Sequence, residues 1–303
     1  MELAPIVLFV YNRLWHTQKT IEALQKNELA SKSELFIYAD GAKSKKSNTQ
    51  VSQVRDYIQE VGGFKKVTII ERNENWGLAN SIIDGVTEIV NKYGCVIVLE
   101  DDLVVGEYFL KFMNNSLNYY EDKKDVWHIS GWNYPISLET SKDVYFYRVM
   151  DCWGWATWSD RWKNFEKNTG FLINSMSSED IDRFNLDGFT DLWRQVKLNK
   201  SGRIDTWAIF WYATIFNHNG LCLNPVKSYV MNIGNDGTGV HCAKSSQYGD
   251  ITLNSNKESV FERDIIENDL IVSQVKKFFK DTKRSLFVRI IGRLYSLIIK
   301  KIL

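Results

Sequence analysis

Residues 95–102 read Cys-Val-Ile-Val-Leu-Glu-Asp-Asp, so five apolar residues are followed directly by three acids. An uninterrupted apolar run of this length is typical of a β-strand that is buried on both faces of a parallel sheet. In an open α/β sheet, ligands bind beyond the carboxyl ends of the strands. This stretch therefore predicts the fold class and also the place of the functional site.

The residues before this stretch alternate between two hydrophobic periods. Three further runs have strand character, and they read LAPIVLFV at 3–10, ELFIYA at 34–39 and KVTIIE at 66–71. The segments between the four runs place apolar residues on one helical face, at 17–26, 48–61 and 78–93. This order predicts a parallel sheet that is covered by helices and joined by right-handed crossovers.

The residues after this stretch are less regular. We expect strands at 126–130 and 143–148, helices at 108–120, 177–199 and 206–217, a tryptophan-rich segment at 153–162 and a polar loop at 230–242. We interpret residues 1–125 as a Rossmann-like, nucleotide-sugar-binding half of one α/β domain. Residues 126–250 form its acceptor-binding half, and 251–303 form a helical tail.

Polar residues follow each of the first four predicted strands. They are Tyr11 and Arg13 after the first, Asp40 after the second, Asn73 and Trp76 after the third, and Glu100, Asp101 and Asp102 after the fourth. Because these strand ends share one edge of the sheet, a single ligand could touch them all. Each residue also has a simpler interpretation, as an exposed loop, an Asp-Gly turn, a helix cap or a core ring.

The three adjacent acids predict a divalent cation. Clustered carboxylates repel one another unless a cation or hydrogen-bond donors compensate them. Mg²⁺ and Mn²⁺ prefer oxygen ligands and keep positions open for substrate phosphates. The alternative is a solvated acidic turn that caps a helix.

These motifs resemble those of GT-A fold glycosyltransferases, in particular the animal N-acetylglucosaminyltransferase of hybrid N-glycan synthesis and bacterial surface-polysaccharide sugar transferases. The resemblance is most specific at residues 98–105, VLEDDLVV, which are followed by Tyr108-Phe109 and a helix. It continues at 9–13 (FVYNR), Asp40, Asn73 with Trp76, 129–133 (ISGWN) and Gly154-Trp155, and it covers about residues 3–240. It implies a GT-A-type, mostly parallel sheet and a nucleotide-sugar donor, with uridine favoured as the nucleoside.

The resemblance also implies roles for individual residues. Asp102 would bind Mn²⁺ or Mg²⁺, and the late His241 would complete the metal or diphosphate site. The donor contacts would come from Tyr11, Arg13, Asp40, Asn73, Trp76, Glu100, Asp101, Gly154 and Trp155. The family has a histidine where this chain has Asn73.

Inverting sugar transfer needs a carboxylate to take the proton of the acceptor hydroxyl. In the resembling family this base is an Asp beside a Trp at the start of a helix, which fits Asp205 in Asp205-Thr206-Trp207. Asp205 could equally be only a helix cap. Asp151 and Asp160, which flank the tryptophan-rich segment, are the alternatives.

Charge divides the chain into two parts. Nine of the 38 basic residues but only one of the 37 acidic residues lie in 276–303, so residues 1–275 carry a net charge of −7. An acidic body argues against a nucleic-acid partner. The end of the chain, SLFVRIIGRLYSLIIKKIL at 285–303, predicts a basic amphipathic helix on an anionic membrane surface. The alternative is a helix that packs on its own body or on another subunit.

Four widely spaced cysteines, with no metal-binding spacing, indicate reduced thiols. The first residues lack the features of a signal peptide, and no apolar run is long enough to span a membrane. We therefore expect a cytoplasmic protein that is peripheral on the inner face of the cell membrane. The predicted activity is metal-dependent, inverting sugar transfer from a nucleotide sugar to a saccharide hydroxyl, with a lipid-linked oligosaccharide as the expected acceptor.

Two other functions compete with this prediction. A sugar-phosphate nucleotidyltransferase would usually carry a glycine-rich phosphate loop after the first strand, where this chain has Tyr11-Asn12-Arg13-Leu14. A non-catalytic carbohydrate-binding protein would need the aromatic residues but not the three acids.

Overall fold

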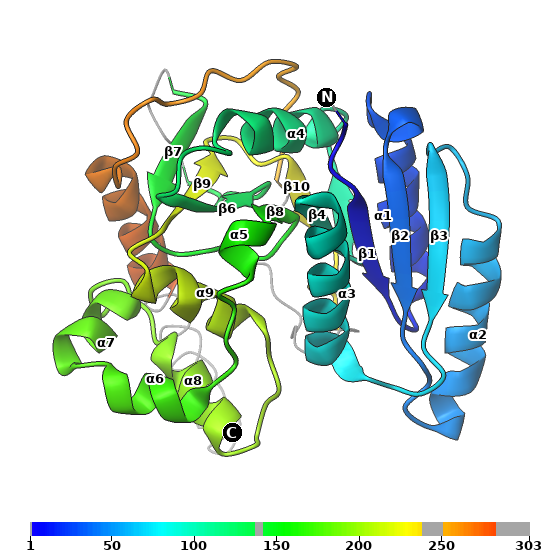
Figure 1. The fold of residues 1–303 in the computed structure, drawn as a ribbon, viewed down its shortest axis with the longest axis horizontal. Coiled ribbons are helices and arrows are strands. Elements are labelled where there is room, and N and C mark those ends of the chain that lie inside the picture. Colours follow the sequence, from blue (N-terminus) through cyan, green and yellow to red (C-terminus); the bar gives the residue numbers. More distant parts are fainter. Residues whose placement is uncertain (1, 137–141, 238–250, 283–303) are drawn as a thin grey trace, which may run out of the picture.

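The computed structural model describes residues 2–136, 142–237 and 251–282, and an eight-stranded sheet forms its centre (Figure 1). The first half of the sheet is parallel, with the order β3-β2-β1-β4. Its strands are β1 (Ile6–Val10), β2 (Glu34–Ala39), β3 (Lys66–Glu71) and β4 (Cys95–Glu100). All four coincide with predicted strands.

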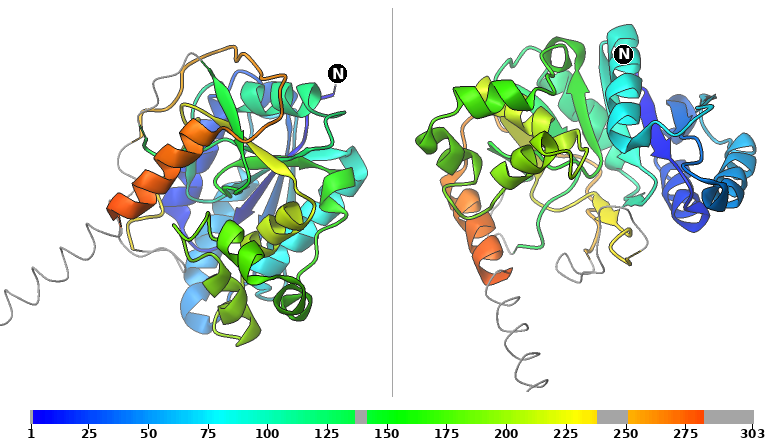
Figure 2. Two further views of the ribbon diagram at one scale, coloured as in Figure 1. Left: turned by 90° about the vertical axis from the view of Figure 1, so that its left-hand side faces the viewer. Right: turned by 90° about the horizontal axis from the view of Figure 1, so that it is seen from below.

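Three helices connect these strands. They are α1 (Leu14–Gln25), α2 (Lys45–Gln59) and α3 (Gly77–Tyr93), and a short 3-10 helix, η1 (Ala30–Lys32), precedes β2. Helices α1 and α2 cover one face of this half and α3 covers the other (Figures 1 and 2). Each helix turns an apolar stripe towards the sheet, as Val51, Val54 and Ile58 do in α2.

The second half extends the same sheet beyond β4, in the order β4-β8-β6-β9-β7. These strands are β6 (Val126–Ser130), β7 (Val144–Tyr147), β8 (Trp155–Trp158) and β9 (Leu221–Pro225). Strand β8 is antiparallel to both β4 and β6, whereas β6 and β9 are parallel. The structure thus confirms the α/β class and the mostly parallel sheet flanked by helices.

The helices of the second half lie around this part of the sheet. They are α4 (Phe109–Tyr119), α5 (Ser159–Trp162), α6 (Thr169–Ser175), α7 (Ser178–Phe184), α8 (Trp193–Lys200) and α9 (Ala208–Asn217). The prediction of a single helix over 177–199 was wrong, because α7 and α8 are separate helices. Between them Leu186, Asp187 and Gly188 all adopt positive φ angles, which a right-handed helix excludes.

The tryptophan-rich segment forms core rather than a surface platform. The Trp155 ring is stacked on the Trp207 ring at 5.1 Å and contacts the Trp162 ring at 5.7 Å between centroids. Trp211 packs against Trp162 in turn, and all four side chains are buried. These rings therefore join β8, α5 and α9 into one core.

Residues 251–282 pack against the body instead of forming a separate tail. The Tyr120 hydroxyl donates a hydrogen bond to the Glu262 carbonyl at 2.9 Å, and Lys111 pairs with Glu258. Residues 269–282 are helical (Figure 2), and Ile271 and Val275 from this helix are buried. The predicted basic amphipathic helix at 285–303 lies outside the described residues. Within the described ranges, no helix combines the length and apolarity needed to cross a membrane.

Candidate functional site

The three acids lie at the carboxyl edge of the sheet, where β4 ends beside β1. Glu100 is paired in register with Phe9, and Asp101 and Asp102 follow it in a turn where both are buried. The parallel pairing also brings Arg13, which immediately precedes α1, to this edge. We call Glu100, Asp101 and Asp102 the acid triplet.

The Arg13 guanidinium bridges two members of the acid triplet. Its Nη2 atom donates to Asp101 Oδ1 and, at 2.8 Å, to Asp102 Oδ2. Burial alone would lower the pKa of Arg13, but the two carboxylates raise it above its ordinary value, so the guanidinium stays charged. The sequence placed Arg13 and the triplet at one edge but did not predict that they pair with each other.

One guanidinium does not neutralise three carboxylates. In the described part of the chain, the Glu100 side chain makes no hydrogen bond or ion pair, and its pKa is raised by burial and by repulsion from Asp102 and Asp101. With all three acids ionised, the triplet and Arg13 carry a net charge of −2. The arrangement therefore favours a further cation, or a proton held on Glu100.

A second, two-stranded sheet brings a loop over the acid triplet. Strand β5 (Leu103–Val105), directly after the triplet, pairs antiparallel with β10 (Val230–Asn232). The Ile233 amide then donates to the Asp102 carbonyl at 2.9 Å. A Cβ atom on Gly234 would lie 2.0 Å from Asp102 Oδ2, so only glycine fits this close approach. His241, the predicted second metal ligand, lies outside the described residues.

The oxygen donors and negative charge of the acid triplet suit Mg²⁺ or Mn²⁺. Among residues 2–136, 142–237 and 251–282, however, no three His, Cys, Asp or Glu side chains form a cluster that could hold an ion. A cation bound by Asp102 would thus need oxygen atoms from a substrate to complete its coordination. This pattern is usual for Mg²⁺, which binds one or two carboxylates together with substrate phosphates.

Asp151 lies beside a pocket of about 270 Å³ that follows β7 and reaches the first turn of α9. Its carboxylate accepts hydrogen bonds from the Tyr147 hydroxyl at 2.7 Å and the Tyr134 hydroxyl at 3.2 Å. Burial raises the pKa of Asp151 to about 7, although the two hydroxyls act to lower it. A carboxyl group with such a pKa can exchange a proton near neutral pH.

The Asp151 pocket and the acid triplet are neighbours. The thiol of Cys152, next to Asp151 in the chain, is near enough to both for the charges of Glu100, Asp151 and Asp102, together with burial, to raise its pKa. The antiparallel pairing of β8 with β4, with Trp155 opposite Val98, explains this proximity. The segment that precedes β8 thus runs alongside the end of β4.

A buried histidine holds the backbone of Asp151. His128 Nε2 is 3.0 Å from the Asp151 carbonyl, while the Trp211 indole N–H donates to His128 Nδ1 at 3.2 Å. Burial lowers the pKa of His128 to about 3, so the ring is neutral and its Nε2–H donates to the carbonyl. His128, Tyr134 and Tyr147 could not be assigned to this site from the sequence, because nothing in their spacing connects them with Asp151.

Asp205, the first candidate for the base, lies on the segment that leads into α9. Its side chain is 63% exposed and pairs with Lys167. The first residues of α9, including Ala208 and Ile209, line the Asp151 pocket. Asp205 therefore lies shortly before these pocket-lining residues in the sequence but does not line the pocket itself, whereas Asp151 does. Asp160 pairs with Lys124 and Arg161 instead.

Asp40 has a structural role at this edge. Its carboxylate accepts four hydrogen bonds, from the backbone amides of Gly41, Trp76 and Gly77 and from Asn75 Nδ2. All its acceptor positions are thus used to anchor the start of α3. A ribose contact from Asp40, which stays a prediction, requires one of these bonds to break.

The other predicted donor contacts differ in exposure. Tyr11 is half-buried and accepts a hydrogen bond from the Lys43 amide at 3.2 Å, while Asn73 is exposed. Trp76 is 37% exposed, with the Arg72 guanidinium 3.9 Å from its ring centroid. Trp155 is only 1% exposed, a position that favours core packing over contact with a ligand.

Gly154 approaches α4 and β10 closely. Its φ is +67°, and a Cβ atom there would lie 2.9 Å from the Val230 side chain and 3.2 Å from Phe109. Packing therefore accounts for this glycine. It is the turn at Gly154 that leads the chain from Asp151 into β8.

Comparisons with known proteins add little to this geometry. A scan against protein-family models found no match to the chain, and neither did a search of curated proteins. Among solved structures, the chain is similar to the crystal structure of S. aureus TarS, with 10% sequence identity and a TM-score of 0.43. The likeness covers 77% of this chain but only 37% of that chain. So slight a likeness carries no argument about function.

Proposed function

We propose that the protein is a metal-dependent, inverting glycosyltransferase that moves a sugar from a nucleotide-sugar donor, with a UDP-sugar favoured, to a saccharide hydroxyl. One observation carries the proposal. An acid triplet with uncompensated negative charge ends β4, and the segment that leads into the neighbouring strand β8 carries Asp151, which lines a pocket and has a carboxyl pKa of about 7. A diphosphate with its cation fits the acid triplet, and an acceptor hydroxyl fits the pocket beside Asp151.

In this proposal Asp151 is the general base. The acceptor hydroxyl gives its proton to the Asp151 carboxylate, and its oxygen forms a bond to the anomeric carbon of the donor. The bond between that carbon and the diphosphate oxygen breaks, and the nucleoside diphosphate leaves with its electron pair. A divalent metal, held by Asp102, would stabilise the charge of the leaving diphosphate.

Arg13 has two possible uses in the same site. In the described conformation it compensates Asp101 and Asp102, and with a donor bound it could pair with phosphate oxygens, which guanidinium groups hold well. The loop at 232–237, which approaches Asp102 at Ile233 and Gly234, would contact the bound diphosphate.

The first experiment is a screen for hydrolysis and transfer with UDP-glucose, UDP-galactose, UDP-N-acetylglucosamine and GDP-mannose. Each donor is tested with Mn²⁺, with Mg²⁺ and with a chelator. We expect slow, metal-dependent hydrolysis of at least one of them. Synthesis of a nucleotide sugar from a sugar phosphate would instead support the nucleotidyltransferase. Saccharide binding without any turnover would support a non-catalytic protein.

The second experiment compares two isosteric variants, Asp151→Asn and Asp205→Asn. A base acts in the transition state, so its loss lowers kcat while donor affinity stays within a few-fold. We expect this result for Asp151→Asn and near-normal transfer for Asp205→Asn. The opposite pattern would assign the base to Asp205.

We further propose that the protein acts at an anionic membrane surface, on the cytoplasmic side, with a lipid-linked acceptor. The helix at 269–282 supports this, because Phe278 and Phe279 contact the ring of Tyr134, which lines the Asp151 pocket. The basic residues and apolar face at 285–303 follow this helix in the sequence. An acceptor on a lipid would thus be presented beside the pocket.

A further inference from the structure

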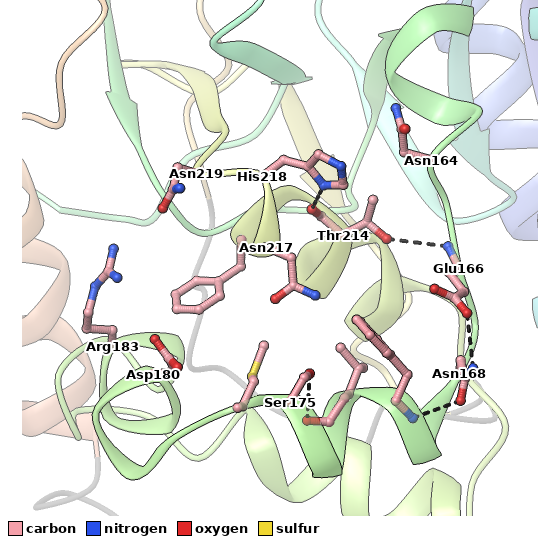
Figure 3. Close-up of a pocket in the computed structure, with 14 residues that line it drawn as sticks. Asn164, Glu166, Asn168, Ser175, Asp180, Arg183, Thr214, Asn217, His218 and Asn219 are labelled. Atoms are coloured by element: carbon pink, nitrogen blue, oxygen red, sulfur yellow. Dashed lines mark hydrogen bonds between the residues drawn. The ribbon is translucent and has the colours of Figure 1, made fainter.

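A second pocket, of about 570 Å³, borders the last part of α9, whereas the Asp151 pocket borders its first part. Its walls come from the segment before α6, from α6 and α7, and from the last turn of α9 (Figure 3). Figure 3 shows Glu166 and Asn168 on one side, Arg183 and Asp180 on the other, and the Asn217 amide between them. Nothing in the proposed transfer reaction uses this pocket.

Several polar groups around the pocket have free hydrogen-bonding capacity. In the described part of the chain, the side chains of Asn217 and Asn219 make no hydrogen bond or ion pair. The Arg183 guanidinium lies over the Phe216 ring, 5.3 Å from its centroid, with no carboxylate within ion-pair distance among the described residues. Glu166 uses one carboxylate oxygen, which accepts from Asn168 Nδ2 at 3.0 Å. Amides, a carboxylate and a guanidinium therefore face one hollow.

This mixture of groups suits the hydroxyl groups of a neutral saccharide. An amide side chain both donates and accepts, as each sugar hydroxyl does. The lining carries no excess of positive charge, because Glu166 and Asp180 are acidic and Arg183 is its one Lys or Arg residue; Asp180 also caps α7 through Ser177. A phosphate or nucleotide would instead require an excess of positive charge.

An exposed aromatic ring completes the pocket. Phe171, on α6, is 50% exposed and lines the hollow beside the amide groups. An aromatic face next to hydrogen-bonding groups offers an apolar surface to the C–H face of a sugar ring.

The pocket is distinct from the Asp151 pocket. Tyr212 lines the Asp151 pocket and Thr214 lines the second one, so both pockets border α9, but they share no lining residue. The buried Phe184 ring packs against Tyr212, which lines the Asp151 pocket, and against Phe216, which lines the second one. A ligand in the second pocket thus does not occupy the reacting position.

We propose that this pocket is a second carbohydrate-binding site, which holds a neutral sugar unit remote from the reacting hydroxyl. This second site goes beyond the proposed transfer function, and sugar binding to it can be measured without any transfer activity. Binding to isolated short saccharides should be weak, with a Kd on the order of 1 mM, because few groups contact each sugar.

The test measures binding of maltotriose, cellotriose and chitotriose by saturation-transfer NMR and by titration of ¹⁵N-labelled protein. The variants are Asn217→Ala and Phe171→Ala, and the matched control is Asn48→Ala, an exposed helical asparagine on α2. Loss of one hydrogen bond predicts a roughly two- to tenfold weaker Kd for Asn217→Ala. Phe171→Ala should also bind more weakly, and Asn48→Ala should bind as the wild type does.

Three outcomes would overturn the proposal. The first is that none of the three saccharides binds. The second is that Asp151→Asn removes saccharide binding, whereas Asn217→Ala and Phe171→Ala do not. The third is that the neutral tripeptide trialanine binds to this pocket in preference to the saccharides. Donor hydrolysis is measured on the same preparations. Hydrolysis without saccharide binding at Asn217 rejects only the second site, whereas binding at Asn217 without hydrolysis rejects only the transferase.

Discussion

At the scale of single residues, the position of Asp102 makes it the most direct test of the metal. It is buried, pairs with Arg13 and is contacted by the backbone of Gly234. Asp102→Asn keeps the shape of the side chain but removes its charge. We expect at least about a hundredfold loss of turnover, which corresponds to roughly 2.7 kcal/mol of barrier.

Folding of the Asp102→Asn variant should survive, because Arg13 keeps its pair with Asp101 and the repulsion within the triplet decreases. Asp56→Asn, at an exposed position on α2, is the matched control and should have full activity. Near-normal, metal-dependent turnover by Asp102→Asn would remove the basis for placing a metal there.

Asp151 gives a prediction for pH. Burial raises the pKa of this carboxyl to about 7, and the base must be ionised to act. The value of kcat should therefore rise with pH and level off above about 7. The Tyr147 hydroxyl bond lowers this pKa, so Tyr147→Phe should move the rise to higher pH. If kcat of both the wild type and Tyr147→Phe instead rose around pH 4, where an ordinary Asp carboxyl titrates, Asp151 would not be the base.

The same shift affects stability. An Asp in the unfolded chain has a pKa near 3.9, so between that value and the folded pKa the folded protein binds the extra proton. The contribution of Asp151 to stability is thus fully present below about pH 4 and decreases as pH rises through 7. Asp151→Asn should flatten the fall in Tm between about pH 4 and 7, as thermal melts in matched buffers can show.

The sequence predicted which residues gather at the sheet edge better than it predicted what they do there. Buried apolar runs that end in polar residues correctly indicated Arg13 and the acid triplet. The Arg13–Asp101 pair could not be predicted, because it depends on β1 and β4 being neighbours although β2 and β3 lie between them in the chain. The four hydrogen bonds of Asp40 likewise depend on how two loops meet.

At the scale of elements, the turn before β8 can be tested with a pair of glycines. Gly154 and Gly202 have nearly the same φ, +67° and +68°, but only Gly154 has atoms within 4 Å of a Cβ position. Gly202→Ala should lose about 1 kcal/mol of unfolding free energy from the left-handed conformation alone. Gly154→Ala should lose more, because the added methyl meets Val230 and Phe109.

Denaturant unfolding of both variants measures this difference directly. Because the Gly154 turn also positions Asp151, we expect Gly154→Ala to lower transfer as well, whereas Gly202→Ala should leave it unchanged. Equal destabilisation of the two variants would show that the packing of Gly154 has no energetic role.

Strands β8 and β9 were not predicted as strands, for different reasons. Residues 155–158, Trp-Ala-Thr-Trp, are buried on both faces and show no alternation of apolar and polar residues. Residues 221–225 contain Asn224 and Pro225, which are depleted in strands. The break between α7 and α8, by contrast, had a visible signal in Asp187-Gly188, a common turn pair.

At the scale of the whole molecule, two truncations separate the role of the C-terminal helix from that of the residues beyond it. Truncation after Lys283 removes Arg284, Arg289, Arg293, Lys300 and Lys301 together with the apolar residues among them. Each basic residue near an anionic lipid contributes about 1 kcal/mol before screening by salt. This variant should keep its fold and its donor hydrolysis but should no longer sediment with anionic vesicles at low salt.

Truncation after Asn268 also removes Ile271, Val272 and Val275, all of which are buried. Burial of each such side chain stabilises by about 1.5–3 kcal/mol, so this variant should lose several kcal/mol of stability. Full-length protein that ignores anionic vesicles at every salt concentration would contradict the membrane proposal.

The order of strands in the sheet has a consequence for synthesis on the ribosome. Strand β8 joins β4 to β6 but is made after both, so the edge of β4 stays unpaired until Trp158 has emerged. At roughly 5–20 residues per second, the chain between Glu100 and Trp158 takes on the order of several seconds to appear. During that interval the nascent chain exposes an apolar strand edge, which can pair with another nascent chain on the same messenger. Crowded translation should therefore lower the yield of folded protein, and slower initiation should restore it.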